Sequence, residues 1–165
     1  MWIRTETAAD HDAIARVIAT AFAGAAHASG TEAGIVAALR RAGALALSLV
    51  AHIDGRIAGH VALSPVVLDD GSDGWFGLGP VAVDPRDQGH GVGRALVRAA
   101  LAELPALGAR GCVVLGEPAY YTRFGFRHHA ALRYPQASAG YFLALGLDAA
   151  PPAASVAYHA AFSAD

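Results

Sequence analysis

The sequence has a single cysteine, Cys112, among its 165 residues. One thiol cannot form a disulfide within the chain, and it cannot build a metal cluster of cysteines. The paired spacings of common metal sites, His-Glu-x-x-His and Cys-x-x-Cys, are also absent. The adjacent His128 and His129 are expected on a strand, where neighbours point to opposite faces and chelate poorly. We therefore expect no metal, and the low cysteine content favours a reducing, cytoplasmic compartment.

An excess of positive charge and long apolar runs are lacking as well. The 12 Lys and Arg residues against 14 Asp and Glu give a formal net charge of -2. This balance gives no sign of a nucleic-acid groove or of an anionic membrane surface as partner. No apolar run reaches the roughly 18 residues of a membrane-spanning helix, and residues 1–6 lack the basic start and apolar core of a signal peptide. A soluble protein is expected.

Apolar residues, in contrast, make up 55% of the chain. At this length they are sufficient for one domain over residues 1–165 with a substantial core. Period-two and helical patterns, with their turn and cap signals, divide the chain into elements. Strands are expected at residues 2–5, 45–53, 56–68, 75–83, 112–115, 141–147 and 155–162. One helix is expected to begin after a capping box at residues 7–10, and two further helices are expected at 32–41 and 92–104. The Gly- and Ala-rich segment 24–31 is expected to be a loop and a wall of an acceptor site. The whole chain is expected to form a mixed α/β fold with a mostly antiparallel sheet.

The most informative segment is residues 88–94, between an apolar strand and an amphipathic helix. A glycine-rich turn at a helix N-terminus binds anions, because free backbone N-H groups converge there and the helix dipole favours negative charge. The candidate phosphate-binding residues are Gln88, Gly89, His90, Gly91, Val92, Gly93 and Arg94. A nucleotide-hydrolysing P-loop would need Gly-Lys followed by Ser or Thr, which is absent here. A dinucleotide fingerprint would need glycine at Arg94, which weakens an oxidoreductase interpretation, although Glu117 could imitate the acid that holds a ribose.

The spacing Gln88-x-x-Gly91-x-Gly93 resembles the pyrophosphate-binding motif of the GNAT superfamily of acyl-CoA-dependent N-acetyltransferases. A second block, residues 113–126, is similar to the strand, short helix and Tyr-x-x-x-Gly-Phe ending that follow this motif in the family, with Tyr121 rather than Tyr120 at the tyrosine position. The resemblance implies a mostly antiparallel central sheet with helices on both faces. It also implies transfer of an acetyl group from acetyl-CoA to a small-molecule or peptide amine, and a possible homodimer.

The resemblance further implies roles for several residues. The backbone at Val81, Ala82 and Val83 would hold the pantetheine arm, with an N-H near Val81 or Val83 polarising the acyl oxygen. Tyr121 would protonate the departing thiolate. Pro80 cannot donate to a strand ladder, so it marks an edge or a bulge in this strand. An asparagine common in the family after the next strand is replaced here by Gly116 or Glu117.

The base that deprotonates the amine has two candidates. Glu117 lies at a strand end beside the expected cleft, and His60 lies among small residues on a strand face, where its ordinary pKa suits a base. Each also fits a plain structural role, Glu117 as a solvated carboxylate and His60 as a hydrogen-bonded core residue. Cys112 begins an apolar strand and is expected to be a buried hydrophobe rather than a nucleophile, which favours direct transfer. A CoA-binding sensor without turnover stays open as an alternative.

Overall fold

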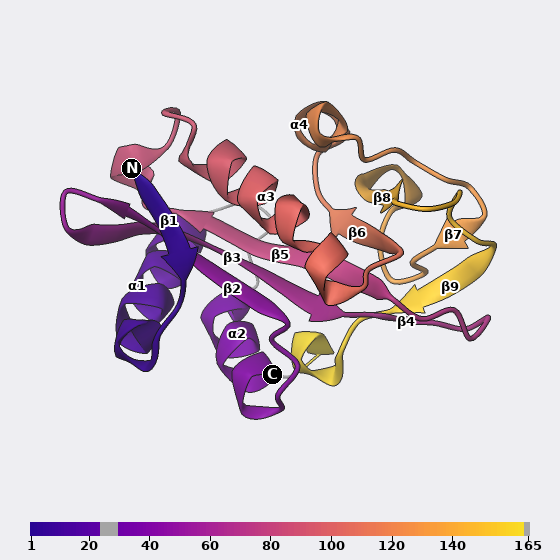
Figure 1. Cartoon of the computed structure of the whole chain (residues 1–165), viewed down its shortest axis with the longest axis horizontal. Helices are drawn as coiled ribbons and strands as arrows, with labels where there is room; N and C mark the ends of the chain where they lie inside the picture. The colour runs from indigo at the N-terminus through magenta and orange to yellow at the C-terminus, as the bar shows by residue number, and fades with distance from the viewer. Residues whose placement is uncertain (24–29, 164–165) are drawn as a thin grey trace.

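A six-stranded sheet forms the centre of the molecule in the computed structural model, which describes residues 1–23 and 30–163. Its strands lie in the order β1-β2-β3-β5-β6-β8 (Figure 1). Their bounds are Trp2–Thr5, Leu47–Ile53, Arg56–Pro65, Trp75–Val83, Gly111–Leu115 and Phe142–Gly146. Neighbouring strands are antiparallel except β5 and β6, which are parallel. The predicted mixed, mostly antiparallel sheet is confirmed.

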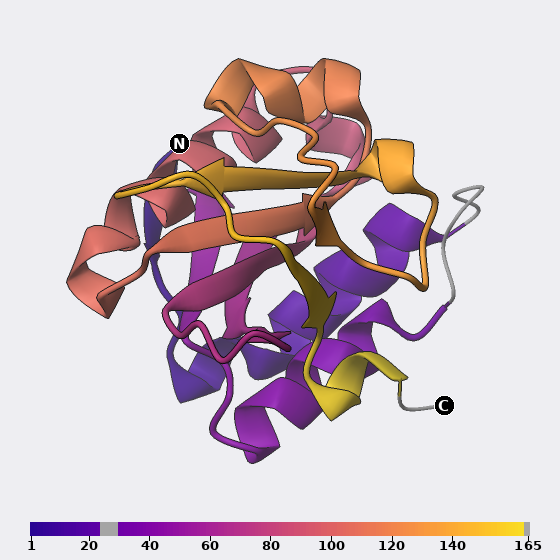
Figure 2. The same cartoon turned by 90° about the vertical axis from the view of Figure 1, so that its right-hand side faces the viewer.

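Helices cover both faces of this sheet, as predicted. α1 (His11–Phe22) and α2 (Glu32–Arg41) lie on one face, and α3 (Val92–Glu103) lies on the other (Figure 2). A short helix, α4 (Pro118–Tyr121), follows β6. The loop predicted at 24–31 falls largely on residues 24–29, outside the described residues. No helix within the described ranges is long and apolar enough to cross a membrane.

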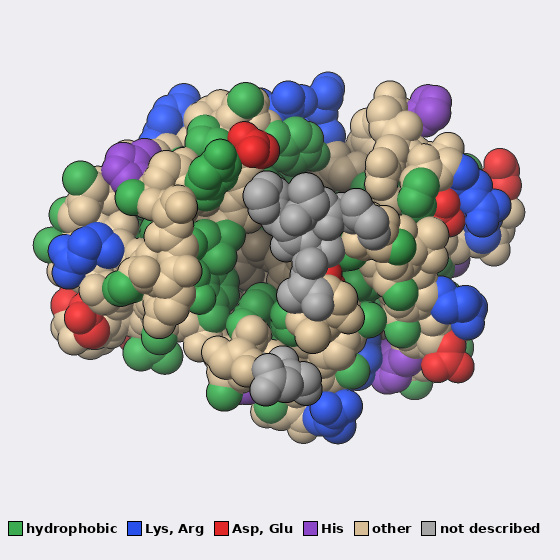
Figure 3. All heavy atoms as spheres, turned by 180° about the vertical axis from the view of Figure 1, so that it is seen from behind, with side chains coloured by type: hydrophobic (Ala, Val, Ile, Leu, Met, Phe, Trp, Pro, Cys, Tyr) green, Lys and Arg blue, Asp and Glu red, His purple; other side chains and the backbone are tan. Residues whose placement is uncertain are grey.

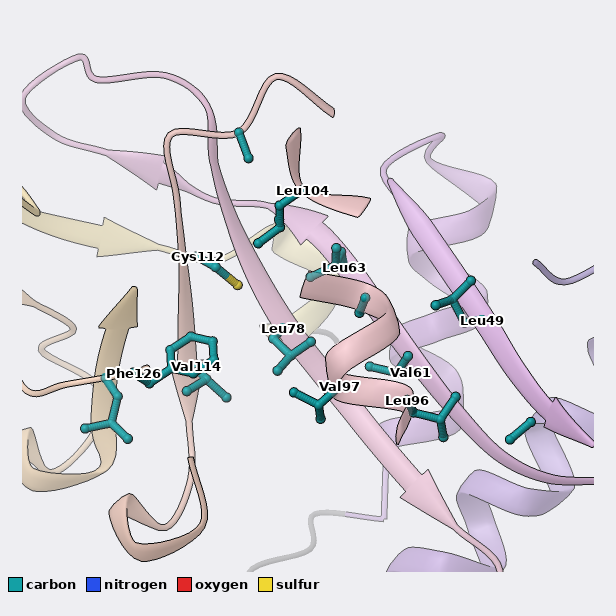
Figure 4. Packing of buried hydrophobic residues seen from close by; sticks show 14 of the residues in the cluster. Leu49, Val61, Leu63, Leu78, Leu96, Val97, Leu104, Cys112, Val114 and Phe126 are labelled. Carbon is teal, nitrogen blue, oxygen red and sulfur yellow. The ribbon is translucent and has the colours of Figure 1, made fainter. Parts of the chain in front are cut away.

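The α3 face holds the largest apolar cluster. Leu96, Val97 and Ala100 of α3 pack against β3 and β5, and Figure 4 shows Leu96 and Val97 beside Val61 and Leu78. These helix residues recur at three- and four-residue steps, so their burial follows directly from the amphipathic pattern. This packing sets the position of the first turn of α3 against β5, where the glycine segment lies.

The capping box predicted before α1 is present. Thr7 N donates to Asp10 Oδ2 at 2.6 Å, and Arg4 donates to both oxygens of the same carboxylate at 2.7 and 2.9 Å. The Arg4 hydrogen bonds outweigh burial and hold the pKa of Asp10 well below its usual value. A single turn of 3-10 helix (Ala8–Asp10) precedes α1 itself.

Three predicted strands need correction. The strand predicted at 56–68 is divided, because the chain leaves β5 after Val66, whose N-H donates to Trp75 O at 3.0 Å. The following strand, β4 (Val67–Leu68), pairs with β9 (Ala154–Ala157) in a second small sheet that also contains β7 (Leu132–Arg133). The strand predicted at 155–162 ends at Ala157, and His159 Nδ1 accepts a hydrogen bond from Ala161 N at the start of a 3-10 turn. His128 and His129 are not in a strand. Local patterns did not reveal these changes of pairing partner.

Candidate active site

The turn between β5 and α3 exposes the first amide groups of a helix. Gly91 is the N-cap of α3 with a φ of 86°, a left-handed conformation that glycine adopts without steric cost. The first N-H groups of a helix have no carbonyl four residues earlier to bond to. Those of α3 are therefore donors available to a ligand.

Two side-chain interactions hold this turn in place. Gln88 Nε2 donates to Val83 O at 3.0 Å. Arg56 donates to Asp87 through Nη1 at 2.5 Å and Nη2 at 2.8 Å, and these hydrogen bonds hold the pKa of Asp87 below its usual value. The turn is thereby tied both to the end of β5 and to the start of β3. The Arg56–Asp87 pair was not predicted from the sequence.

A cavity of about 250 Å³ lies against this turn. It is lined by Val83, Asp87, Gln88, Gly89, Gly91, Val92, Gly93, Arg94 and Tyr120. His90 is not among the lining residues, and its Nδ1 lies 3.3 Å from Asp87 O. A Cβ on Gly93 would lie 3.3 Å from Tyr120 Oη, so glycine leaves the cavity open between α3 and α4. The Tyr-x-x-x-Gly-Phe spacing favours Tyr121, and the sequence gives no separate signal for Tyr120.

β5 and β6 pair over only the first part of β5. Trp75 to Leu78 pair with β6, whereas residues 79–83 have no partner there. On its other edge β5 stays paired with β3, with a register shift opposite residues 61–63. This shift is the bulge predicted at Pro80, which is confirmed. The two central strands therefore separate next to the N-terminus of α3.

The backbone of β5 directs two N-H groups toward this separation. Asp84 N donates to Ala58 O of β3 at 2.8 Å. Because successive N-H groups on a strand point to opposite edges, Val83 and Val81 direct theirs away from β3. Ala82 has the opposite orientation, and its side chain is buried among residues of α1. Of the three predicted β5 residues, Val81 and Val83 thus present donors to the gap and Ala82 does not.

Tyr121 lies on α4, packed on the end of β6. Its ring lies so close to Gly116 that a Cβ there would clash with it, which explains a glycine at this position. The ring makes edge-to-face contacts with Tyr120 at 5.0 Å and Phe126 at 6.0 Å. Burial, with a smaller contribution from Tyr120, raises the pKa of Tyr121 to about 12. Its hydroxyl stays protonated at neutral pH and is available as a donor.

His60 lies on β3 and is 0% exposed. Its Nε2 is 2.7 Å from Ser48 Oγ, and Ser48 Oγ in turn donates to Glu6. Burial lowers the pKa of His60 to about 4, so the ring is neutral at pH 7. His60 is directly opposite Ala82 in the β3·β5 register, one strand away from the gap and on the face covered by α1 and α2.

Comparison with known proteins identifies the family of this chain. Residues 44–128 match the family model of the acetyltransferase (GNAT) domain. The uncharacterized N-acetyltransferase YhbS of Escherichia coli is 39% identical over 140 residues, which cover 82% of this chain and 81% of YhbS. This chain belongs to the GNAT family of acetyltransferases.

Solved GNAT structures extend the similarity to the whole chain. A GNAT family acetyltransferase from Brucella melitensis, in complex with acetyl-CoA, is 46% identical with a TM-score of 0.87 and covers 98% of this chain and 97% of its own. The structure of YhbS from Escherichia coli in complex with CoA is 36% identical with a TM-score of 0.88, covering 99% and 92%. The GNAT resemblance and the acyltransferase class predicted from sequence are confirmed, and the oxidoreductase alternative is removed.

Glu117, the other base candidate in this GNAT chain, is exposed to solvent. It is the N-cap of α4, and its backbone oxygen accepts hydrogen bonds from Tyr120 N and Tyr121 N at 3.0 Å each. Its carboxylate makes no hydrogen bond or ion pair within residues 1–23 and 30–163. Glu117 is therefore a solvent-exposed residue at the start of α4 that does not line the cavity at the glycine turn, while His60 is enclosed.

Cys112 is buried in the α3-side cluster, as expected, and burial raises the pKa of its thiol well above the usual value. A thiol of this kind is a poor nucleophile. Among the described residues no group of three His, Cys, Asp or Glu side chains is arranged to hold a metal.

Proposed function

We propose that this GNAT chain transfers an acetyl group from acetyl-CoA to a primary amine of a small molecule or peptide, directly and in a ternary complex. The observation that carries the proposal is the separation of β5 from β6 beside a helix N-terminus with free amides. A pyrophosphate against the amides of α3 would let the pantetheine arm extend into this gap. Two similar GNAT proteins, one solved in complex with acetyl-CoA and one with CoA, support acetyl-CoA as the ligand.

The surroundings of the α3 N-terminus suit an anionic ligand. Arg94 lines the cavity at the glycine turn. Arg123 lies with its guanidinium 4.7 Å from the centre of the Tyr120 ring, and Arg98 lies 5.6 Å from the centre of the Phe124 ring. These stacked arginines keep positive charge next to the cavity, where it attracts phosphate groups.

The chemistry requires a polarised carbonyl, a neutral amine and a proton for the sulfur. The N-H of Val81 or Val83 is positioned to donate to the acyl oxygen, which gains negative charge as the amine attacks. The C-N bond forms and the C-S bond breaks. Tyr121 donates its hydroxyl proton to the departing sulfur. Glu117 and His60 are the residues proposed to deprotonate the amine.

Steady-state kinetics on a panel of amines, with CoA detected through its free thiol, test this function. Tyr121→Phe should lower kcat by about 100-fold, as expected for loss of a general acid, with the KM for acetyl-CoA unchanged. Tyr134→Phe is the matched control, because Tyr134 packs in a separate cluster against Tyr158 and Phe142. An unchanged kcat in Tyr121→Phe would reject the acid role. Binding of CoA without transfer to any amine would instead favour the sensor alternative.

A further inference from the structure

A continuous chain of hydrogen bonds runs from His60 to the protein surface. His60 Nε2 lies 2.7 Å from Ser48 Oγ, which donates to Glu6 Oε1. Glu6 also accepts two hydrogen bonds from Arg40 of α2, each at 2.9 Å, and lies 3.1 Å from His11 Nε2 of α1. Burial alone would raise the pKa of Glu6, but the hydrogen bonds from Arg40 and Ser48 outweigh it and the pKa is lowered. Glu6 is therefore ionised at neutral pH.

The chemistry of this chain fixes the tautomer of His60. An ionised carboxylate can only accept hydrogen bonds, so the single proton of the Ser48 hydroxyl points to Glu6. Ser48 Oγ must then accept from His60, which places the ring proton on Nε2. In the neutral ring the other nitrogen, Nδ1, is left with a free lone pair.

That lone pair has no partner in the described part of the protein. His60 Nδ1 is buried and makes no hydrogen bond. Leaving a buried polar atom unpaired costs about 1–3 kcal/mol, and the Ser48–Glu6 chain holds the ring in the orientation that incurs this cost. A group kept in this way indicates a hydrogen-bond donor that arrives with a ligand or a water molecule.

Two further unpartnered atoms lie on the same face of the sheet. Ser64 is two strand repeats along β3 from His60, and its buried Oγ makes no hydrogen bond within the described chain. Ser64 is directly opposite Gly77, and the ring of Tyr158 covers that glycine, with an equally unpartnered Oη. The β5 bulge at Pro80 lies between these positions and His60. The molecular surface opposite α3 is hollowed near its centre (Figure 3). His60 Nδ1, Ser64 Oγ and Tyr158 Oη are all buried beneath this face, and none of the three has a hydrogen-bond partner among the described residues.

We propose that His60 accepts the proton of the attacking amine at Nδ1, and that Ser48 and Glu6 position its ring for this role. The proposal rests on the acetyl transfer proposed above. As the C-N bond forms, the amine nitrogen gains positive charge and its N-H becomes acidic, so even a weakly basic imidazole can take the proton. The sulfur takes the Tyr121 proton as the C-S bond breaks. The imidazolium and the tyrosinate then return to their neutral forms by proton exchange with water.

The charged groups around His60 are consistent with this role. The Glu6 carboxylate favours the imidazolium and the Arg40 guanidinium opposes it, and burial outweighs both. His11 joins the same cluster through Glu6. His60 is therefore neutral before the reaction, and its positive charge exists only while the amine proton is held.

A first experiment determines the tautomer without any variant. Nitrogen-15 correlation spectra of the labelled, folded protein at pH 7 distinguish Nδ1-H from Nε2-H imidazole. We expect His60 to be the Nε2-H tautomer in the wild type, with the Nδ1-H form appearing in Ser48→Ala. A wild-type His60 in the Nδ1-H form would overturn the proposal, because no lone pair would face the amine.

A second experiment separates catalysis from stability. His60→Gln should lower kcat by about 100-fold, and Ser48→Ala and Glu6→Gln by about 10-fold through loss of ring orientation, with the KM for acetyl-CoA unchanged. Asp10→Asn is the matched control, because it removes another partly buried ion pair of the same region, with Arg4, that does not contact His60.

The outcomes distinguish this proposal from the function on which it rests. Asp10→Asn should lower the melting temperature and leave kcat unchanged. Equal losses of kcat in Ser48→Ala and Asp10→Asn, or an unchanged kcat in folded His60→Gln, would overturn the role of His60 while acetyl transfer stands. Failure of the wild type to acetylate any amine would overturn the proposed function, and this proposal with it.

Discussion

Gly93→Ala should separate stability from CoA binding. Gly93 lies in the first turn of α3 with an ordinary helical backbone, so alanine should stabilise the fold by about 0.5–1 kcal/mol. For a chain of this size that is an increase in melting temperature of about 1–4 °C. The new Cβ, however, would lie 3.3 Å from Tyr120 Oη and 3.5 Å from Val83 Cγ2, inside the cavity at the α3 N-terminus.

The expected loss of CoA affinity follows from that position. A phosphate oxygen held away from the α3 amides loses one charge-assisted hydrogen bond, which is about 1.5–3 kcal/mol, or roughly 10- to 100-fold in Kd. Isothermal titration with CoA measures this loss, and thermal unfolding measures the stability. Gly34→Ala is the control, because Gly34 is an exposed helix position of α2 where a Cβ meets nothing within 4 Å. An unchanged CoA affinity in Gly93→Ala would refute the pyrophosphate assignment.

Three further predictions concern the stability of the fold and the glycine turn before α3. Asp10→Asn should reduce stability at pH 7, and the difference in stability from wild type should shrink as the pH falls below about 4. The Arg4 ion pair lowers the folded-state pKa of Asp10, so its stabilisation is lost when the carboxylate is protonated. A difference in denaturation that does not change with pH would contradict this. Leu96→Ala should lower the free energy of unfolding by about 2–5 kcal/mol, since the Leu96 side chain of α3 is fully buried against β3. Urea denaturation measures this loss, and a smaller loss would contradict the prediction. Arg56→Gln should weaken CoA binding in the same titration by releasing Asp87 and the glycine turn, and wild-type affinity would show that the ion pair does not position the turn.

Local sequence patterns predicted most of the central sheet and its helices. The faces of α1 and α3, the capping box at Thr7 and the bulge at Pro80 each depend on residues close together in the chain. The second sheet was missed because β4, β7 and β9 are two to four residues long and pair only through contacts distant in sequence. Such pairings leave no periodic signal within a single segment.

The candidate site shows the same division. The glycine turn was predictable because its motif is contiguous, and the structure places it around the α3 N-terminus. The features that were not predicted join residues from separate elements: Tyr120 in the cavity, the Arg56–Asp87 pair and the Ser48–His60 contact. Their positions depend on how β2, β3 and α4 pack, which spacing along the chain does not determine.

The most direct test of the proposed function is amine-dependent release of CoA from acetyl-CoA by the purified protein, with the acetylated amine identified by mass spectrometry. We expect release and product formation with at least one primary amine, both strongly reduced in Tyr121→Phe. Tight binding of CoA with no acetylated product from any amine in the panel would contradict the proposed function.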